Sequence, residues 1–121
     1  MLQGDFYSIQ SEEEISSESR RFQVEIKSDH PIFLGHFPSQ PVVPGVCLIQ
    51  ISKELCEMIV HRKLFLEKSV NIKFLNVVDP RIHPVISFDI RLRQLENEHV
   101  NVDVVIYGAA TTFVKFSGQL R

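Results

Sequence analysis

The chain has 121 residues, of which 44% are hydrophobic and 23% are charged, and its formal net charge at pH 7 is -2. These values are typical of one soluble globular domain, so we predict a single domain over residues 1–121. The slightly acidic balance does not favour nucleic-acid binding, which usually needs a basic face. No apolar run has the length of a membrane span, and residues 1–10 do not read as a secretory signal, so we expect no membrane association.

The two cysteines, Cys47 and Cys56, fall in one stretch that we expect to be helical. They do not suggest a disulfide framework, and they fit a reducing compartment. We therefore predict a cytoplasmic protein. No pair of the five histidines has a convincing metal-ligand spacing. The sequence thus predicts no metal and no cofactor.

The N-terminal third of the chain contains candidate strands separated by a polar segment. Residues 5–10 are a weak strand candidate. The glutamate-rich residues 11–19 are typical of a solvated turn or a short helical excursion. In residues 22–26 the apolar side chains alternate with polar ones, which predicts a half-buried strand.

One long helix is predicted to begin at Pro44, because a proline in the first turn loses no hydrogen bond. Residues 46–51 are apolar on nearly every side, so we expect the first turns to be buried. Further along, one face stays apolar while the other is expected to open to water. The residues expected on that open face are Lys53, Glu54, Glu57 and Arg62.

The rest of the chain alternates between apolar and polar residues with the period of two that predicts strands. These predicted strands cover residues 70–74, 86–92, 100–106 and 114–116, with hairpin turns at 96–98 and 108–110. The whole pattern predicts an α+β domain, in which a strongly curved antiparallel sheet wraps around one buried helix.

Residues 30–50, HPIFLGHFPSQPVVPGVCLIQ, contain four of the six prolines. Each proline fixes its own φ angle and restrains the residue before it, so this segment is expected to be a stiff loop. Gly35 allows a tight turn beside His36. Gly45 leaves the helix start bare, so that a ligand oxygen can reach its N–H groups. These features predict a binding or catalytic site.

The order Gly35-His36-Phe37-Pro38, then Pro41, then Pro44-Gly45-Val46 resembles the motif GHFPG-x-P-x-x-PGV of the 3-hydroxyacyl-acyl-carrier-protein dehydratases. Residues 70–80 also resemble the family strand that leads to a Pro-Gly-Asp turn. The strong motif covers about a fifth of the chain, and the architecture most of it.

This resemblance implies the hot-dog fold, in which a sheet wraps a central helix and two subunits join their sheets. It implies a 3-hydroxyacyl substrate carried by an acyl carrier protein, in fatty-acid or specialised polyene-type synthesis. The catalytic base implied by position is His36, which removes the proton from C2. Backbone N–H groups near Gly45 or Val46 are the implied oxyanion donors. Phe37 is a candidate for the acyl-binding wall, as are Phe33 and Phe74, although all three are equally expected in the core.

The sequence departs from the family pattern at the helix carboxyl group, which in the family comes from the other subunit. That position is Gln50, whose amide does not release a proton at neutral pH. Three interpretations stay open: a slow or specialised dehydratase that uses His36 alone, a heterodimer whose related subunit supplies the acid, or an acyl-binding or partner-stabilising subunit. Ser39 and Pro80-Arg81-Ile82 also differ from the family pattern.

Other candidates carry less weight. Glu54, one helical turn beyond Gln50, is a possible substitute acid. His30 is expected to shape the loop. Cys47 is expected to pack in the core, although a helix start can lower the pKa of a thiol. A hot-dog thioesterase is the second enzyme class, but it commonly needs a helix carboxylate as well. A homodimer or a heterodimer with a related hot-dog subunit is predicted, because a monomer would expose a sheet edge and half an acyl tunnel.

Overall fold

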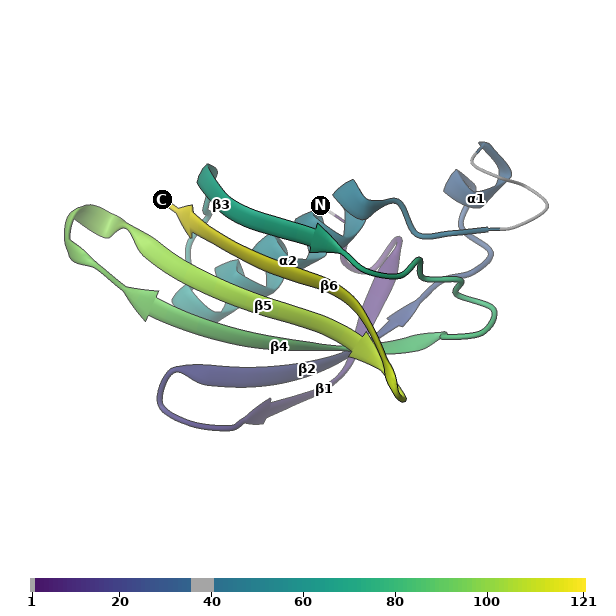
Figure 1. The fold of residues 1–121 in the computed structure, drawn as a ribbon, viewed down its shortest axis with the longest axis horizontal. Coiled ribbons are helices and arrows are strands. Elements are labelled where there is room, and N and C mark those ends of the chain that lie inside the picture. The colour runs from purple at the N-terminus through teal and green to yellow at the C-terminus, as the bar shows by residue number, and fades with distance from the viewer. Residues whose placement is uncertain (1, 36–40) are drawn as a thin grey trace.

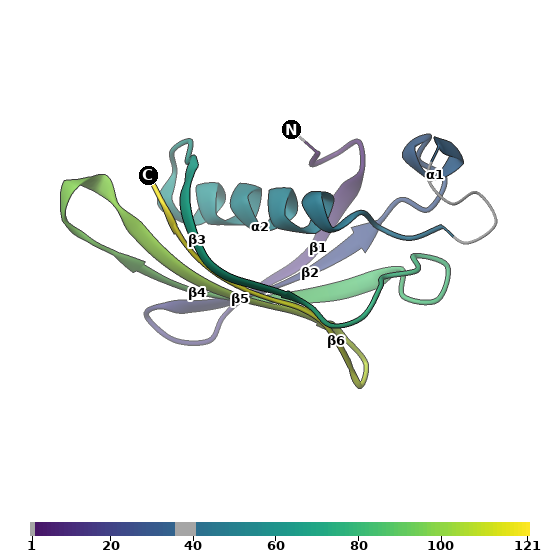
Figure 2. The ribbon, with the colours of Figure 1, turned by 45° about the horizontal axis from the view of Figure 1, so that its top comes forward.

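The computed structural model describes residues 2–35 and 41–121. In these ranges six strands form one antiparallel sheet, and the long helix α2 (Gly45–Val60) lies on its concave side (Figures 1 and 2). The predicted α+β class, with a curved sheet around one long helix, is confirmed. Within the described residues, no helix combines the length and the apolar character needed to cross a membrane.

The strands run in the spatial order β1-β2-β4-β5-β6-β3, so β1 and β3 form the two edges of the sheet. Their bounds are β1 (Tyr7–Glu14), β2 (Ser19–Ile26), β3 (Leu66–Phe74), β4 (Val85–Gln94), β5 (Val100–Gly108) and β6 (Thr111–Leu120). A short helix α1 (Ile32–Gly35) precedes α2, and a single 3-10 turn, η1 (Glu96–Glu98), joins β4 to β5. The predicted turns are confirmed, with positive φ angles at Asn97 and Ala109.

The polar stretch 11–19 differs from its prediction, because its first four residues continue β1. Only residues 15–18 form the turn to β2. On this edge strand the glutamates face solvent, and two of them pair with arginines of β2: Glu12 Oε2 lies 2.7 Å from Arg20 Nη1, and Glu13 Oε1 lies 3.5 Å from Arg21 Nη1. A strand that is charged on both faces shows no period of two, so the hydrophobic pattern does not reveal it.

The core lies between the concave face of the sheet and one side of α2. Alternate residues of the central strands point inward, and Ile86, Phe88 and Ile106 are fully buried. They form one hydrophobic cluster with Ile51 and Leu55 of the helix. The inward-facing residues of the strands and the apolar face of the helix therefore form a single layer of apolar side chains.

The helix itself departs from two expectations. Its first turns are not buried on every side, because the side chain of Val46 is 77% exposed. The prediction that Glu54 faces solvent is also wrong, since this residue is only 2% exposed. The sheet covers just one side of α2, which leaves an apolar surface at its start. The N-terminal residues cover Glu54.

Truncation of the core side of α2 should be costly. We expect Leu55→Ala to lower the free energy of unfolding by about 2–5 kcal/mol, because it leaves a cavity under the sheet. Met58→Ala, at a position that is 36% exposed, is the matched control and should cost less than about 1 kcal/mol. Urea denaturation of both variants measures the difference. Equal losses would contradict the burial pattern of α2.

Candidate functional site

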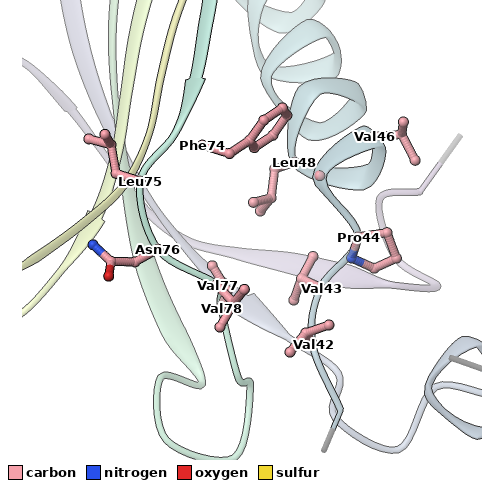
Figure 3. A pocket seen from close by; sticks show the side chains of 11 residues that line it. Val42, Val43, Pro44, Val46, Leu48, Phe74, Leu75, Asn76, Val77 and Val78 are labelled. Carbon is pink, nitrogen blue, oxygen red and sulfur yellow. The ribbon is translucent and has the colours of Figure 1, made fainter. Parts of the chain in front are cut away.

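An apolar groove of about 540 Å³ lies at the start of α2. Two chain segments, residues 42–46 and 74–78, face each other across it, and Leu48 lies between them (Figure 3). The N–H of Val43 donates to the carbonyl of Val78 at 2.8 Å, which ties the loop before α2 to the segment after β3. The stiff proline-rich loop is therefore anchored where it meets the helix.

The predicted substrate-binding residues Gly45 and Val46 both line this groove. Pro44 precedes them, and its carbonyl accepts hydrogen bonds from the N–H groups of Cys47 at 2.9 Å and Leu48 at 3.3 Å. The first N–H groups of a helix have no acceptor within the helix. Gly45 and Val46 thus supply the positive end of the α2 dipole to the groove wall.

Gly45 is also required by close packing. A Cβ atom at this position would lie 2.6 Å from Cε1 of Phe74, at the end of β3. The absence of a side chain lets the aromatic ring sit against the helix start. Phe74 is nevertheless 58% exposed, because its other side faces solvent. The ring therefore forms a wall of the groove, and its acyl-binding role stays a prediction.

Gln50 lies in a second, adjacent pocket of about 390 Å³. Val46 and Phe74 line both pockets and separate them. The remaining described lining is mostly apolar and comes from α2, β3 and β6, including Ile49, Leu66, Ile72, Phe116 and Leu120. The predicted residues Gly45, Val46 and Gln50 are thus gathered along one side of the first turns of α2.

The side chain of Gln50 is held by Glu54, one helical turn further on. Its Nε2 donates to Glu54 Oε2 at 2.8 Å. The same carboxylate accepts hydrogen bonds from the Tyr7 hydroxyl at 3.0 Å and from the backbone N–H groups of Leu2 at 2.9 Å and Gln3 at 3.1 Å. A buried charge is tolerated when it is fully hydrogen-bonded, as here.

These contacts determine the protonation states of Glu54 and Tyr7. Burial opposes ionisation of Glu54, but the hydrogen bonds from Gln50, Leu2, Tyr7 and Gln3 outweigh it, so the pKa of Glu54 lies below its usual value. Burial, together with the charge of Glu54, raises the pKa of Tyr7, which keeps its proton. Glu54 is therefore a carboxylate at neutral pH and does not suit the role of substitute acid.

The sequence shows the spacing between Gln50 and Glu54, but it does not show the contribution of Tyr7, Leu2 and Gln3. Gln50 and Glu54 are four residues apart, so the sequence places them on the same face of a helix. The contact between β1 and α2 joins residues 47 positions apart, and no local pattern reports it. A buried tyrosine needs a partner for its hydroxyl, which is the one available clue.

The predicted catalytic residue His36 and the predicted binding residue Phe37 lie outside the described residues. His30 shapes the loop as expected: its Nδ1 accepts from the N–H of Ile32 at 3.1 Å, and its Nε2 lies 3.1 Å from Asp5. Phe33 packs in the core against Phe6, with ring centroids 5.7 Å apart.

The remaining chemical candidates are structural. Cys47 is buried, and burial raises the pKa of its thiol, so the helix start does not produce a reactive thiolate. Asp79 organises the turn that replaces the family Pro-Gly-Asp, since its Oδ1 accepts from the N–H of Arg81 at 2.9 Å. The hydrogen bond from the Arg81 side chain holds the pKa of Asp79 below its usual value. Within residues 2–35 and 41–121, no three acidic, histidine or cysteine side chains cluster as metal ligands.

Comparison with known proteins gives consistent results. Residues 11–113 match a family described as ApeI-like, ApeI dehydratase. The 3-hydroxyacyl-[acyl-carrier-protein] dehydratase of Rickettsia conorii is 28% identical, over 77% of this chain and 70% of that protein. The corresponding enzyme of Rickettsia canadensis is 29% identical, over 77% and 71% of the two chains.

Solved structures confirm the predicted hot-dog fold. The dehydratase heterocomplex ApeI:P from Xenorhabdus doucetiae superposes with a TM-score of 0.67 at 17% identity, over 93% of this chain and 95% of the other. A mutant thioesterase from Pseudomonas aeruginosa gives a TM-score of 0.65 at 13% identity, over 93% and 78% of the two chains. At these identities the likeness concerns the fold alone.

The Glu54 network should make stability depend on pH. The folded-state pKa of Glu54 lies below the usual 4.5, so its contribution is present above that value and is lost as the pH falls through the lower folded-state pKa. We expect Glu54→Gln to lose about 2 kcal/mol at pH 7 and to flatten the acid dependence of the urea midpoint. Tyr7→Phe keeps the carboxylate and should retain most of that dependence. A Glu54→Gln curve parallel to that of the unaltered protein would contradict this assignment.

Proposed function

Because the chain belongs to the ApeI-like dehydratase family, we propose that it eliminates water from a 3-hydroxyacyl thioester to give a trans-2-enoyl thioester. The observation that carries this proposal is the apolar groove at the start of α2, where Gly45 and Val46 lie beside an aromatic wall. An apolar groove suits an acyl chain, and the positive end of a helix suits a thioester oxygen that gains negative charge.

In the proposed reaction His36 takes a proton from C2, and the electron pair of that C–H bond forms the double bond to C3. The C3–O bond breaks, and the hydroxyl group leaves as water with the proton that His36 returns. The histidine is thereby neutral again. N–H groups of Gly45 or Val46 stabilise the enolate-like oxygen during the transfer. We infer that an acyl carrier protein presents the substrate, as the names of the rickettsial relatives indicate for those enzymes.

Gln50 determines how complete this site is. Its amide supplies hydrogen bonds but no proton, so the leaving hydroxyl depends on His36 unless a partner contributes an acid. One similar structure is a dehydratase heterocomplex, which supports a heterodimer in which a related subunit completes the site. The stand-alone dehydratase and the acyl-binding or partner-stabilising subunit are the competing proposals, and the variants below separate them.

We also propose that two subunits meet along β3. This edge strand adjoins exposed apolar side chains, including Val46, Phe65, Leu66 and Phe74. The opposite edge, β1, carries exposed glutamates instead, which disfavour strand pairing. The apolar patch is the kind of surface that a partner covers. Pairing along β3 also brings the Gln50 pocket close to the partner, because Leu66, Ile72 and Phe74 of that strand line it.

A thioesterase is the second candidate activity, favoured by the fold shared with the Pseudomonas aeruginosa protein. It would require activation of a water molecule beside the thioester carbonyl. The ionised Glu54 is committed to four hydrogen bonds and does not suit this role. Release of a free thiol from an acyl-pantetheine distinguishes this activity from hydration. The pathway, fatty-acid or polyene-type, and the cytoplasmic location stay predictions from the sequence.

Hydration of an enoyl-pantetheine thioester, the reverse reaction, tests the proposed activity. We expect His36→Ala to reduce the rate about 10²- to 10⁴-fold, the usual contribution of a general acid–base residue. Gln50→Glu should raise the hydration rate. The charge of Glu54 lies beside the new carboxyl group at position 50, so it raises the pKa of that group and keeps the group protonated. The gain should therefore shrink as the pH rises through that raised pKa.

Each outcome of this assay separates the proposals. A rate that depends on His36 and rises in Gln50→Glu shows a dehydratase that lacks only its acid. Activity that appears only with a second hot-dog subunit supports the heterodimer. No hydration in any arrangement, with retained binding of an acyl-pantetheine, supports the binding subunit instead.

Light scattering after size-exclusion chromatography tests the β3 interface. We expect a dimer, alone or with a related subunit, and we expect Leu66→Asp to shift it toward monomer because the charge would be buried at the interface. Glu13→Lys on the opposite edge is the matched control and should leave the mass unchanged. A stable dimer in Leu66→Asp would place the interface elsewhere.

A further inference from the structure

The two ends of the Gln50 amide have different chemistry, and Glu54 distinguishes them. The NH₂ group donates hydrogen bonds and the oxygen accepts them, whereas an ionised carboxylate only accepts. Since Glu54 Oε2 lies 2.8 Å from the Gln50 side chain, the NH₂ end must face it. The oxygen, Oε1, is then the end that is not committed to Glu54.

Glu54 is itself unable to turn away. Each of its oxygens has two donors: Leu2 N–H and Gln50 Nε2 on Oε2, and Gln3 N–H and the Tyr7 hydroxyl on Oε1. Two of these donors belong to the backbone, and the carboxylate is only 2% exposed. The backbone N–H groups of Leu2 and Gln3 can only donate, so each oxygen has a partner that disfavours a proton, and the four hydrogen bonds together favour the charged form.

Gln50 lines a pocket whose other described lining is mostly apolar. Among the lining residues that the structure describes, the other polar side chain is Lys53. Its ammonium group lies 5.7 Å from the ring centroid of Phe65 and 3.9 Å from Glu57 Oε2, so it is directed to other partners. A hydrogen-bond acceptor in such a pocket selects ligands that bring a donor.

We propose that Glu54 is a positioning residue that fixes the Gln50 amide with Oε1 toward the pocket, where it accepts a hydrogen bond from the hydroxyl group of an acyl ligand. The helix carboxylic acid of the family, which gives a proton to the leaving hydroxyl, is replaced by an oriented neutral acceptor. The ligand class is therefore an acyl thioester that carries a hydroxyl donor, in preference to the same chain with a methoxy group. The identity of this ligand rests on the proposed function, whereas the amide orientation does not.

The orientation is tested first by NMR on the ¹⁵N-labelled full chain without ligand. The Gln50 NH₂ signal is assigned by its loss in Gln50→Met. We expect one of its protons to be shifted downfield and to exchange slowly with water, because it donates to a buried carboxylate. The exposed Gln94 provides the internal reference. A Gln50 signal that exchanges as fast as that of Gln94 would overturn the proposal.

The ligand preference is tested by the affinity of a 3-hydroxyacyl-pantetheine and its 3-methoxy analogue, with a His36→Ala background to prevent turnover. We expect the hydroxyl compound to bind about tenfold more tightly. Gln50→Met should abolish this preference. Glu54→Gln should reduce it, because an amide at position 54 offers both a donor and an acceptor and leaves Gln50 free to rotate.

Tyr7→Phe and Glu57→Gln are the matched controls. Tyr7→Phe removes a donor from Glu54 without contact to Gln50. Glu57→Gln removes a charge from the same helix at a residue that accepts from the N–H of Leu64. Both should retain the hydroxyl preference, even where stability falls. A preference that survives Gln50→Met, or that Tyr7→Phe removes as fully as Glu54→Gln, would overturn the proposal.

The two experiments keep the proposals apart. Failure of both compounds to bind would overturn the assignment of an acyl ligand, and the NMR signal would still decide the orientation of the amide. Equal binding of both compounds with a protected Gln50 NH₂ group would show an oriented amide that does not select hydroxyl ligands, and it would overturn the ligand assignment.

Discussion

The sheet covers only one side of helix α2, and the rest of the molecule is arranged around this constraint. The curved sheet offers a single concave face, and residues such as Ile51 and Leu55 fill it. Because a sheet cannot surround the helix completely, the other sides of α2 must be covered by different segments. The N-terminal residues cover the side of Glu54, and the end of β3 approaches the helix start at Gly45.

A buried carboxylate connects these segments. Ionisation of Glu54 within the fold is costly, and four hydrogen bonds offset the cost. Those bonds come from β1, from the chain before it and from Gln50, so one charge ties the N-terminal edge of the sheet to the pocket. A protein that needed only a stable core would place an apolar residue there at lower cost. The charge gives the Gln50 amide a defined direction.

The side of α2 that the sheet leaves uncovered presents apolar side chains to solvent. Val46 and Phe74 are largely exposed, yet they separate two apolar pockets. A surface of this kind is unfavourable in an isolated subunit and favourable when a second subunit or an acyl chain covers it. The same side chains line both pockets and belong to the surface along which we propose that two subunits meet.

The α+β class, the long helix, most strands and both hairpin turns could be predicted from the sequence, because alternation, helical repeat and turn residues are local properties. The motif around Gly45 also identified the family and placed Gly45, Val46 and Gln50 on the start of one helix. The end of β1 was missed, since charged residues on an edge strand show no alternation.

The burial and the ionisation of Glu54 depend on contacts that the folded chain brings together. The donors Leu2, Gln3 and Tyr7 are far away from Glu54 along the chain, and a helical pattern alone assigns a glutamate to solvent. The exposure of Val46 also depends on the tertiary structure, because the hydrophobic pattern reports which residues avoid water but not which partner covers them. Burial depends on neighbours that the fold brings together, and local sequence does not specify them.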